Sequence, residues 1–158
     1  MRVGWRRVAT ASRAELKRWT AVIDGLGRQR SWHGALEALE ELKASGVQPD
    51  VVLCTSAINA CSRARQWAHA LHVLGGLAHS GVLPDAIAYN ATITACERGS
   101  QWRRGLQLMA QMRSQSIELG LTTFNASISA CEKGGNWALG LRLLVQMQDT
   151  GLQPNVIT

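Results

Sequence analysis

Apolar side chains recur at helical spacing along the chain, and the pattern itself repeats every 35 residues. In the first half of each repeat, positions 4, 8 and 11 are apolar, as in Tyr89, Ile93 and Cys96, which places them on one face of a helix. In the second half, positions 17, 20, 21, 24 and 27 continue this spacing. We call the two predicted helices of a repeat helix A and helix B.

Two residue series give the register of the repeats. Tryptophan stands at position 17 (Trp32, Trp67, Trp102, Trp137) and cysteine at position 11 in three repeats (Cys61, Cys96, Cys131). The register defines a basic N-terminal segment at 1–15, repeats at 16–50, 51–85, 86–120 and 121–155, and the start of a truncated fifth repeat at 156–158. Ser12 and Glu15 fit a capping box for the first helix.

Glycine at position 31 and proline at position 34 end the hairpin in repeats 1, 2 and 4. The C-terminal end of repeat 3 diverges, with Ser116, Glu118, Leu119 and Gly120 in their place. A single hairpin cannot bury its apolar side alone, so the repeats must stack. We therefore expect an all-α fold, a right-handed α-solenoid superhelix of stacked antiparallel helix-turn-helix repeats, with function on its concave side.

The face of helix A opposite the apolar stripe carries candidate ligand-binding groups. Positions 5 and 9 are short and polar, position 13 is a cation in every repeat, and position 2 is often aliphatic. Aliphatic groups between stacked repeats offer a slot for one flat base, with cations at its edge for the phosphate. The expected base-sandwiching residues are Val52, Ile87, Thr122 and Ile157, and the expected phosphate contacts are Arg28, Arg63, Arg98 and Lys133.

The period of 35, the proline at position 34 and strings such as AIAYNATITACERG (86–99) and TTFNASISACEKG (122–134) resemble the pentatricopeptide repeat family with P-type repeats. This resemblance covers residues 16–158 and implies binding of single-stranded RNA, one nucleotide per repeat, with the first repeat on the 5′ side. It also implies that positions 5 and 35 select the base. These residues are Thr20 with Asp50, Thr55 with Asp85, Asn90 with Gly120, and Asn125 with Asn155.

By the same resemblance, Thr with Asp implies guanine, and Asn with Asn implies a pyrimidine. The implied sequence is 5′-G-G-N-(C or U)-3′, in which the third nucleotide N is undetermined, with a pyrimidine as the option. Structural explanations stay open beside these roles: Asp50, Asp85 and Asn155 are also expected helix N-caps, and the position-13 cations suit helix C-termini. The Trp and Cys series are best explained as packing.

Composition agrees with a binding scaffold. Seventeen Lys and Arg against 11 Asp and Glu give a net charge of +6, which suits a polyanion. The longest stretch without these charges, Gln66 to Pro84, holds three His and several Gly or Pro, so no membrane span is predicted. The four cysteines form no C-x-x-C pair and are expected as free thiols. No catalytic residue, metal site or cofactor is predicted.

The setting and the rival functions follow from weaker signals. Residues 1–14, with Arg2, Arg6, Arg7 and Arg13, fit an organelle-targeting leader or an ordinary basic end. The resemblance implies a chloroplast or mitochondrion, roles in RNA processing, modification, stability or translation, and other RNA-processing proteins as partners. The alternatives are a peptide-binding tetratricopeptide-like scaffold, whose period is about 34 and whose signature is absent, and a fragment without independent activity.

Overall fold

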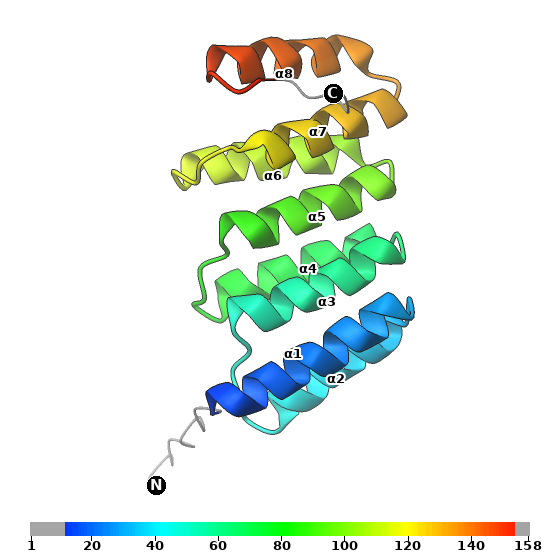
Figure 1. Cartoon of the computed structure of the whole chain (residues 1–158), viewed down its shortest axis with the longest axis vertical. Helices are drawn as coiled ribbons and strands as arrows, with labels where there is room; N and C mark the ends of the chain where they lie inside the picture. The colour runs from blue at the N-terminus through cyan, green and yellow to red at the C-terminus, as the bar shows by residue number, and fades with distance from the viewer. Residues whose placement is uncertain (1–11, 154–158) are drawn as a thin grey trace, which may run out of the picture.

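The computed structural model describes residues 12–153, which fold into eight helices and, within that range, no strand. Figure 1 shows them as a stack of four antiparallel hairpins. The helices are α1 (Arg13–Arg28), α2 (Trp32–Ala44), α3 (Val51–Arg63), α4 (Trp67–His79), α5 (Ala86–Arg98), α6 (Trp102–Ser114), α7 (Leu121–Lys133) and α8 (Trp137–Asp149). Odd-numbered helices are the predicted helices A and even-numbered ones the helices B. The predicted fold class, an all-α solenoid of stacked repeats, is confirmed.

Helix starts follow from local capping. Ser12 Oγ accepts a hydrogen bond from Glu15 N at 3.2 Å, and Ser12 N donates to Glu15 Oε2 at 3.0 Å, which is the expected capping box. Because this cap stands at Ser12, α1 begins at Arg13 rather than at residue 16. The later helices A begin at residues 51, 86 and 121, so the 35-residue period is kept in the structure.

Helix ends share one motif. Each of the eight helices is followed by a residue with positive φ. After α2, Gly46 N donates to Lys43 O and Val47 N donates to Leu42 O, which is the Schellman arrangement. The glycines expected at position 31 fill this place after α2, α4 and α8, whereas Ser116 fills it after α6 with φ 58°.

The stack is held together mainly by helices A. Neighbouring helices A pack on one another, α1 on α3, α3 on α5 and α5 on α7. Each helix B packs on its own helix A and, except for α8, on the helix A of the next repeat, while the backbones of successive helices B stay apart. This difference in spacing curves the stack and puts helices A on its concave side.

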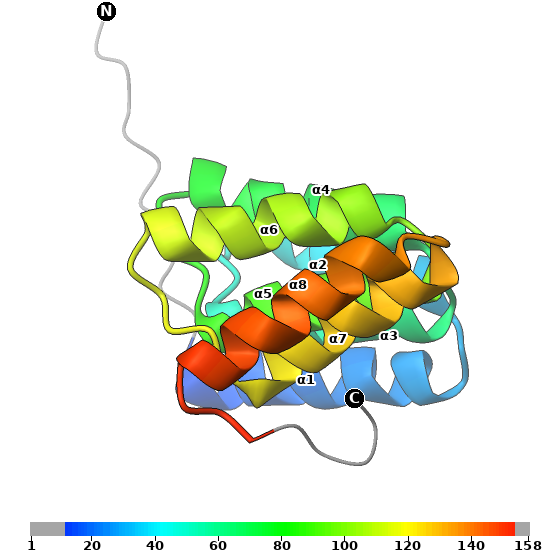
Figure 2. The same cartoon turned by 90° about the horizontal axis from the view of Figure 1, so that it is seen from above.

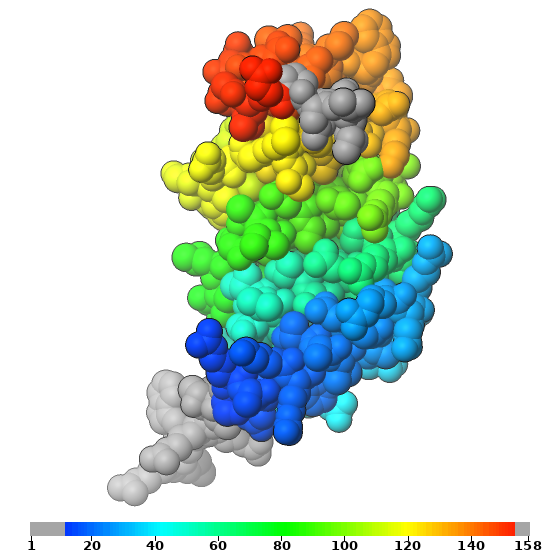
Figure 3. Space-filling view, in the orientation of Figure 1, coloured from blue at the N-terminus to red at the C-terminus, as the bar shows by residue number. Residues whose placement is uncertain are grey.

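The same arrangement is visible from above, where α4 and α6 lie on one side and α1 and α3 on the other (Figure 2). The helices of the last hairpin run obliquely to α1, so the stack is twisted. In the space-filling view each repeat forms one band of the surface (Figure 3). The concave surface therefore presents one row of helix A side chains per repeat.

Among the described residues, no helix is both long and apolar enough to cross a bilayer. The sequence-based assignments for Arg2, Arg6, Arg7, Asn155 and Ile157 lie outside the described part of the chain.

Candidate nucleic-acid interface

A cavity of about 380 Å³ lies on the concave surface where repeat 1 meets repeat 2. Its walls include Thr20 and Asp50, the predicted base-selecting pair of repeat 1, and Val52, the predicted sandwiching residue of repeat 2. Arg13, Lys17 and Asp24 complete its polar lining. The volume falls within the range of about 300–1,000 Å³ typical of small-ligand pockets. Stacking thus brings together groups that are about 30 residues apart in the sequence.

The predicted sandwiching residues stand out from the surface. Val52 is 61% exposed and Ile87 is 67% exposed, although both are aliphatic. Thr122 is also exposed. Aliphatic side chains held in water on regularly spaced helices are available to pack on a flat ring.

The position-5 residues differ in accessibility. Thr20, Asn90 and Asn125 are half-buried, but Thr55 is buried, with 8% of its surface exposed. Thr55 Oγ1 donates to Val51 O at 2.7 Å, within its own helix. The expectation that position 5 is open in every repeat therefore does not hold for repeat 2. The reason is that α3 is flanked by α1 and α5, between which a short Thr side chain does not protrude.

The position-35 aspartates are helix N-caps, as the structural explanation predicted. Asp50 Oδ1 accepts from Leu53 N and Asp85 Oδ1 accepts from Ala88 N, each at 2.8 Å. These bonds occupy one carboxylate oxygen of each residue, and the other oxygen remains an acceptor. Gly120 caps α7 without a side-chain bond.

The position-13 cations form an exposed row along the ends of helices A. Arg28, Arg63 and Arg98 make no salt bridge within residues 12–153. Lys133 is different, because its Nζ donates to Glu97 Oε1 of the preceding repeat. Ser129 Oγ donates to the same Glu97 oxygen at 3.0 Å. The phosphate contact predicted for Lys133 therefore competes with an ion pair.

Asn90 of repeat 3 is linked to the next repeat. Thr123 Oγ1 donates to Asn90 Oδ1 at 2.7 Å, although the two residues are 33 positions apart. Thr123 is fully buried. The oxygen of the Asn90 amide is thus engaged by a buried hydroxyl of the next repeat.

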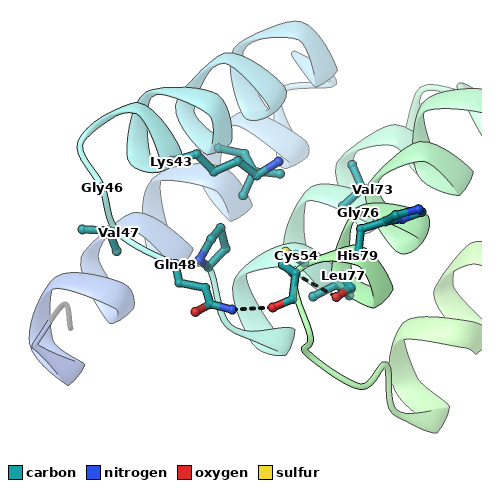
Figure 4. Close-up of a pocket in the computed structure, with 12 residues that line it drawn as sticks. Lys43, Gly46, Val47, Gln48, Cys54, Val73, Gly76, Leu77 and His79 are labelled. Atoms are coloured by element: carbon teal, nitrogen blue, oxygen red, sulfur yellow. Dashed lines mark hydrogen bonds between the residues drawn. The ribbon is translucent and has the colours of Figure 1, made fainter. Parts of the chain in front are cut away.

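A second cavity, of about 560 Å³, lies away from these residues (Figure 4). It is lined mainly by α2, α4 and the connection between repeats 1 and 2, with Lys43 and His79 among its lining. Gln48 Nε2 donates to Ser80 O at 2.8 Å and ties this connection to the end of α4. The cavity contains none of the predicted RNA-binding residues.

The four cysteines are buried and unpaired (Cys54, Cys61, Cys96, Cys131). Burial raises the pKa of Cys61 and of Cys96 to about 11, so these thiols stay protonated at neutral pH. They belong to the core, as predicted. Trp67 and Trp102 pack over Gly99 and Gly134, in the turn of the following repeat.

Sequence reasoning missed two residues of this surface. Glu97 at position 12 was not expected to pair with Lys133, and Thr123 at position 3 was not expected to contact Asn90. The available signal was the register itself, because in-phase stacking brings position 12 of one helix A near position 13 of the next. The signal for the Thr123 contact was weaker: position 3 carries a hydroxyl in repeat 4, whereas repeats 2 and 3 have the apolar residues Leu53 and Ala88 there.

A curved stack of helical hairpins with polar and cationic rows on its concave side defines a helical-repeat binding scaffold. The model of the pentatricopeptide repeat domain matches residues 37–98 and 107–158, and that of the single PPR repeat matches residues 19–47 and 87–117. The chain belongs to the pentatricopeptide repeat family. The tetratricopeptide alternative receives no support from these matches.

Solved structures agree with this assignment. The pentatricopeptide repeat protein PPR10 in complex with an 18-nt psaJ RNA element is 28% identical, with a TM-score of 0.82 over 94% of this chain and 22% of that one. Nuclear proteinaceous RNase P 2 (PRORP2) from A. thaliana is 14% identical, with a TM-score of 0.76 over 89% of this chain and 31% of that one. The chain thus spans about a fifth of PPR10.

The PPR domain of Arabidopsis thaliana protein-only RNase P 1 (PRORP1), in complex with tRNA, is 13% identical, with a TM-score of 0.61 over 90% of this chain and 92% of that one. At this identity, as for PRORP2, the likeness concerns the fold. No curated protein sequence matches significantly.

Proposed function

We propose that the chain binds single-stranded RNA along its concave surface, with one nucleotide per repeat and the first repeat on the 5′ side. The observation that carries the proposal is the cavity formed by Thr20, Asp50 and Val52, which joins two hydrogen-bonding groups to an aliphatic wall. A base needs such a combination, because it presents polar edges and apolar faces.

Hydrogen bonds already made by the protein indicate which base suits repeat 1. Thr20 Oγ1 donates its hydrogen to Leu16 O at 2.8 Å, so its oxygen can only accept from a ligand. The Asp50 oxygen that is not used for capping is also an acceptor. Two acceptors suit guanine, which presents N–H and amino donors side by side. This supports the guanine implied by the family resemblance.

Repeat 2 carries the same pair of residue types, Thr and Asp, but their exposure to solvent differs from that in repeat 1. Thr55 is buried, whereas Asp85 is exposed. In repeat 2 the carboxylate of Asp85 therefore carries most of the selection for guanine.

The experiment that tests base selection uses Asp50→Asn, which keeps the cap and changes the recognition group. Asn caps helices as well as Asp does. Its oxygen keeps the bond to Leu53 N, so its NH₂ group, a donor, replaces the free acceptor oxygen. We expect the preference for guanine at the first nucleotide to fall about tenfold, the scale of one lost base contact.

Asp85→Asn is the matched control, because it should change the second nucleotide and leave the first. Both variants should keep the melting temperature of the parent. Binding is measured with 5′-GGUC-3′ and with its single substitutions A-G-U-C and G-A-U-C, and AAAA serves as the non-cognate RNA. Equal affinity of the parent for GGUC and AAAA, or the same change of preference in both variants, would contradict one-nucleotide-per-repeat recognition.

We infer further that the chain acts as a scaffold and not as an enzyme. The resemblance to the family supports an organellar setting, chloroplast or mitochondrion, with a role in RNA processing, modification, stability or translation, together with other RNA-processing proteins. A fluorescent fusion of the full coding sequence, imaged against chloroplast and mitochondrial markers, tests the setting. Uniform cytosolic signal would contradict it.

A further inference from the structure

Repeat 3 lacks a side chain at position 35, since Gly120 stands there. Of the two base-selecting positions of repeat 3, only position 5, Asn90, therefore has a side chain that can contact the base. An amide has a carbonyl oxygen that accepts and an NH₂ group that donates, so an amide free to rotate by 180° can satisfy either kind of base edge. What repeat 3 selects depends on whether the Asn90 amide is fixed.

The amide is held by Thr123, across the boundary to the next repeat. Four other threonines of helices A donate to the carbonyl four residues earlier, as Thr92 does to Ala88 O at 2.8 Å. Thr123 is the third residue of α7, so the residue four places before it, Leu119, precedes the helix cap. Its hydroxyl hydrogen goes instead to Asn90 Oδ1.

We propose that Thr123 is a positioning residue that turns the NH₂ group of Asn90 toward the groove, so that repeat 3 selects bases with an exocyclic carbonyl oxygen over their amino counterparts. Thr123 is fully buried and Asn90 half-buried, which leaves the far side of the amide facing the concave surface. Because the bond turns the Asn90 oxygen toward this buried hydroxyl, the NH₂ group is the part of the amide on the opposite side. The inference rests on the proposed function.

The chemistry of the bases gives the direction of selection. Uracil and guanine carry carbonyl oxygens at O4 and O6, where cytosine and adenine carry amino groups. The NH₂ group of Asn90 can donate a hydrogen bond to the carbonyl oxygen of uracil or guanine. In cytosine and adenine it meets an amino group, which is also a donor, so no such bond forms. Uracil is therefore expected over cytosine, and guanine over adenine, each by about fivefold, the scale of one hydrogen bond.

The test varies the third nucleotide of a tetranucleotide, with GGUC, GGCC, GGGC and GGAC titrated into the ¹⁵N-labelled chain and followed by NMR, which measures weak affinities. Thr123→Val keeps the shape of the side chain and removes the hydroxyl. In this variant the Asn90 amide rotates freely, so cytosine and adenine should bind more tightly than they do to the parent. The ratio of uracil to cytosine affinity should fall close to one.

Two further variants separate positioning from structure. Thr92→Val removes another buried threonine hydroxyl, one that bonds only within its own helix, and should keep the ratio of the parent. Thr123→Ser restores the hydroxyl and should restore the ratio. Damage to the fold would weaken all four RNAs together and would leave the ratio unchanged.

The outcomes distinguish this inference from the function on which it rests. Equal binding of GGUC and GGCC by the parent, or the same ratio in Thr123→Val and the parent, overturns the role of Thr123 while RNA binding stands. The absence of shifts with all four RNAs overturns the proposed function and this inference with it.

Discussion

The ion pair between Lys133 and Glu97 makes a quantitative prediction about the salt dependence of RNA binding. Arg28, Arg63 and Arg98 have no salt-bridge partner among residues 12–153, whereas Lys133 is held by Glu97, whose side chain is only 14% exposed. A carboxylate with so little exposure keeps its partner better than a fully solvated one does. In the parent chain, we therefore expect three phosphate contacts from the position-13 row instead of four.

The magnitude follows from counterion release. Each phosphate neutralised on a single strand contributes about −0.7 to the slope of log affinity against log salt, so three contacts give a slope of roughly −2. Glu97→Gln removes the negative charge and releases Lys133, and the slope becomes roughly −3. Between 20 and 200 mM salt, the affinity should then fall about six-hundredfold in the variant, against about a hundredfold in the parent.

The assay is a titration of a fluorescent GGUC-containing RNA at five salt concentrations. Glu132→Gln is the matched control, because it removes one negative charge from position 12 of the next repeat, where the structure has no salt bridge to the position-13 row. This control should keep the slope of the parent. Equal slopes in Glu97→Gln, Glu132→Gln and the parent would refute the reasoning. They would show that the ion pair with Glu97 does not keep Lys133 from contacting a phosphate.

Three other predictions concern the packing of the stack. A Cβ at Gly134 would overlap the Trp102 ring, so Gly134→Ala should destabilise the fold by about 1–3 kcal/mol in urea unfolding. At Gly75 an added Cβ meets nothing within 4 Å beyond its two chain neighbours and the backbone of its own helix, so Gly75→Ala should stabilise the fold by about 0.5–1 kcal/mol. Equal effects of the two substitutions would argue against the packing role of the tryptophan. Ser116→Gly relieves a left-handed φ of 58° and should raise the unfolding free energy by about 0.5–1 kcal/mol, and a lower value would show that the serine is not strained there. Because burial raises the pKa of Cys61 to about 11, a thiol reagent at pH 8 should react far more slowly with the folded chain than with the chain in urea, and a rapid native reaction would contradict the buried core.

Much of the fold could be predicted from local signals. The caps at Ser12, Asp50 and Asp85 and the glycines at the ends of α2, α4 and α8 stand where the sequence pattern placed them. These features depend on bonds between residues a few positions apart, which composition and spacing report directly. The positive φ of Arg30, Arg65 and Ser100 was not foreseen, because none of these positions is a glycine. After α5 the glycine, Gly99, stands one place earlier, at the C-cap, with a φ of −89°.

The sequence predicted which positions of each repeat line the candidate site. It did not predict which of these side chains are accessible to a ligand. Helical periodicity placed positions 2, 5 and 13 on one face, and the cavity lined by Thr20 and Val52 agrees with that placement for positions 5 and 2. It could not show that Thr55 is buried, because burial depends on how closely α1 and α5 flank α3.

The sequence by itself determined the 35-residue period, the two helices of each repeat and the face that each side chain occupies, since all three arise from hydrogen bonds within single helices and turns. Only the tertiary structure decided which groups on that face are engaged. The pairing of Lys133 with Glu97 and the bond from Thr123 to Asn90 span 36 and 33 residues. They exist because neighbouring helices A pack at one particular offset, which is set by side-chain packing between repeats and leaves no trace in the periodicity of either helix.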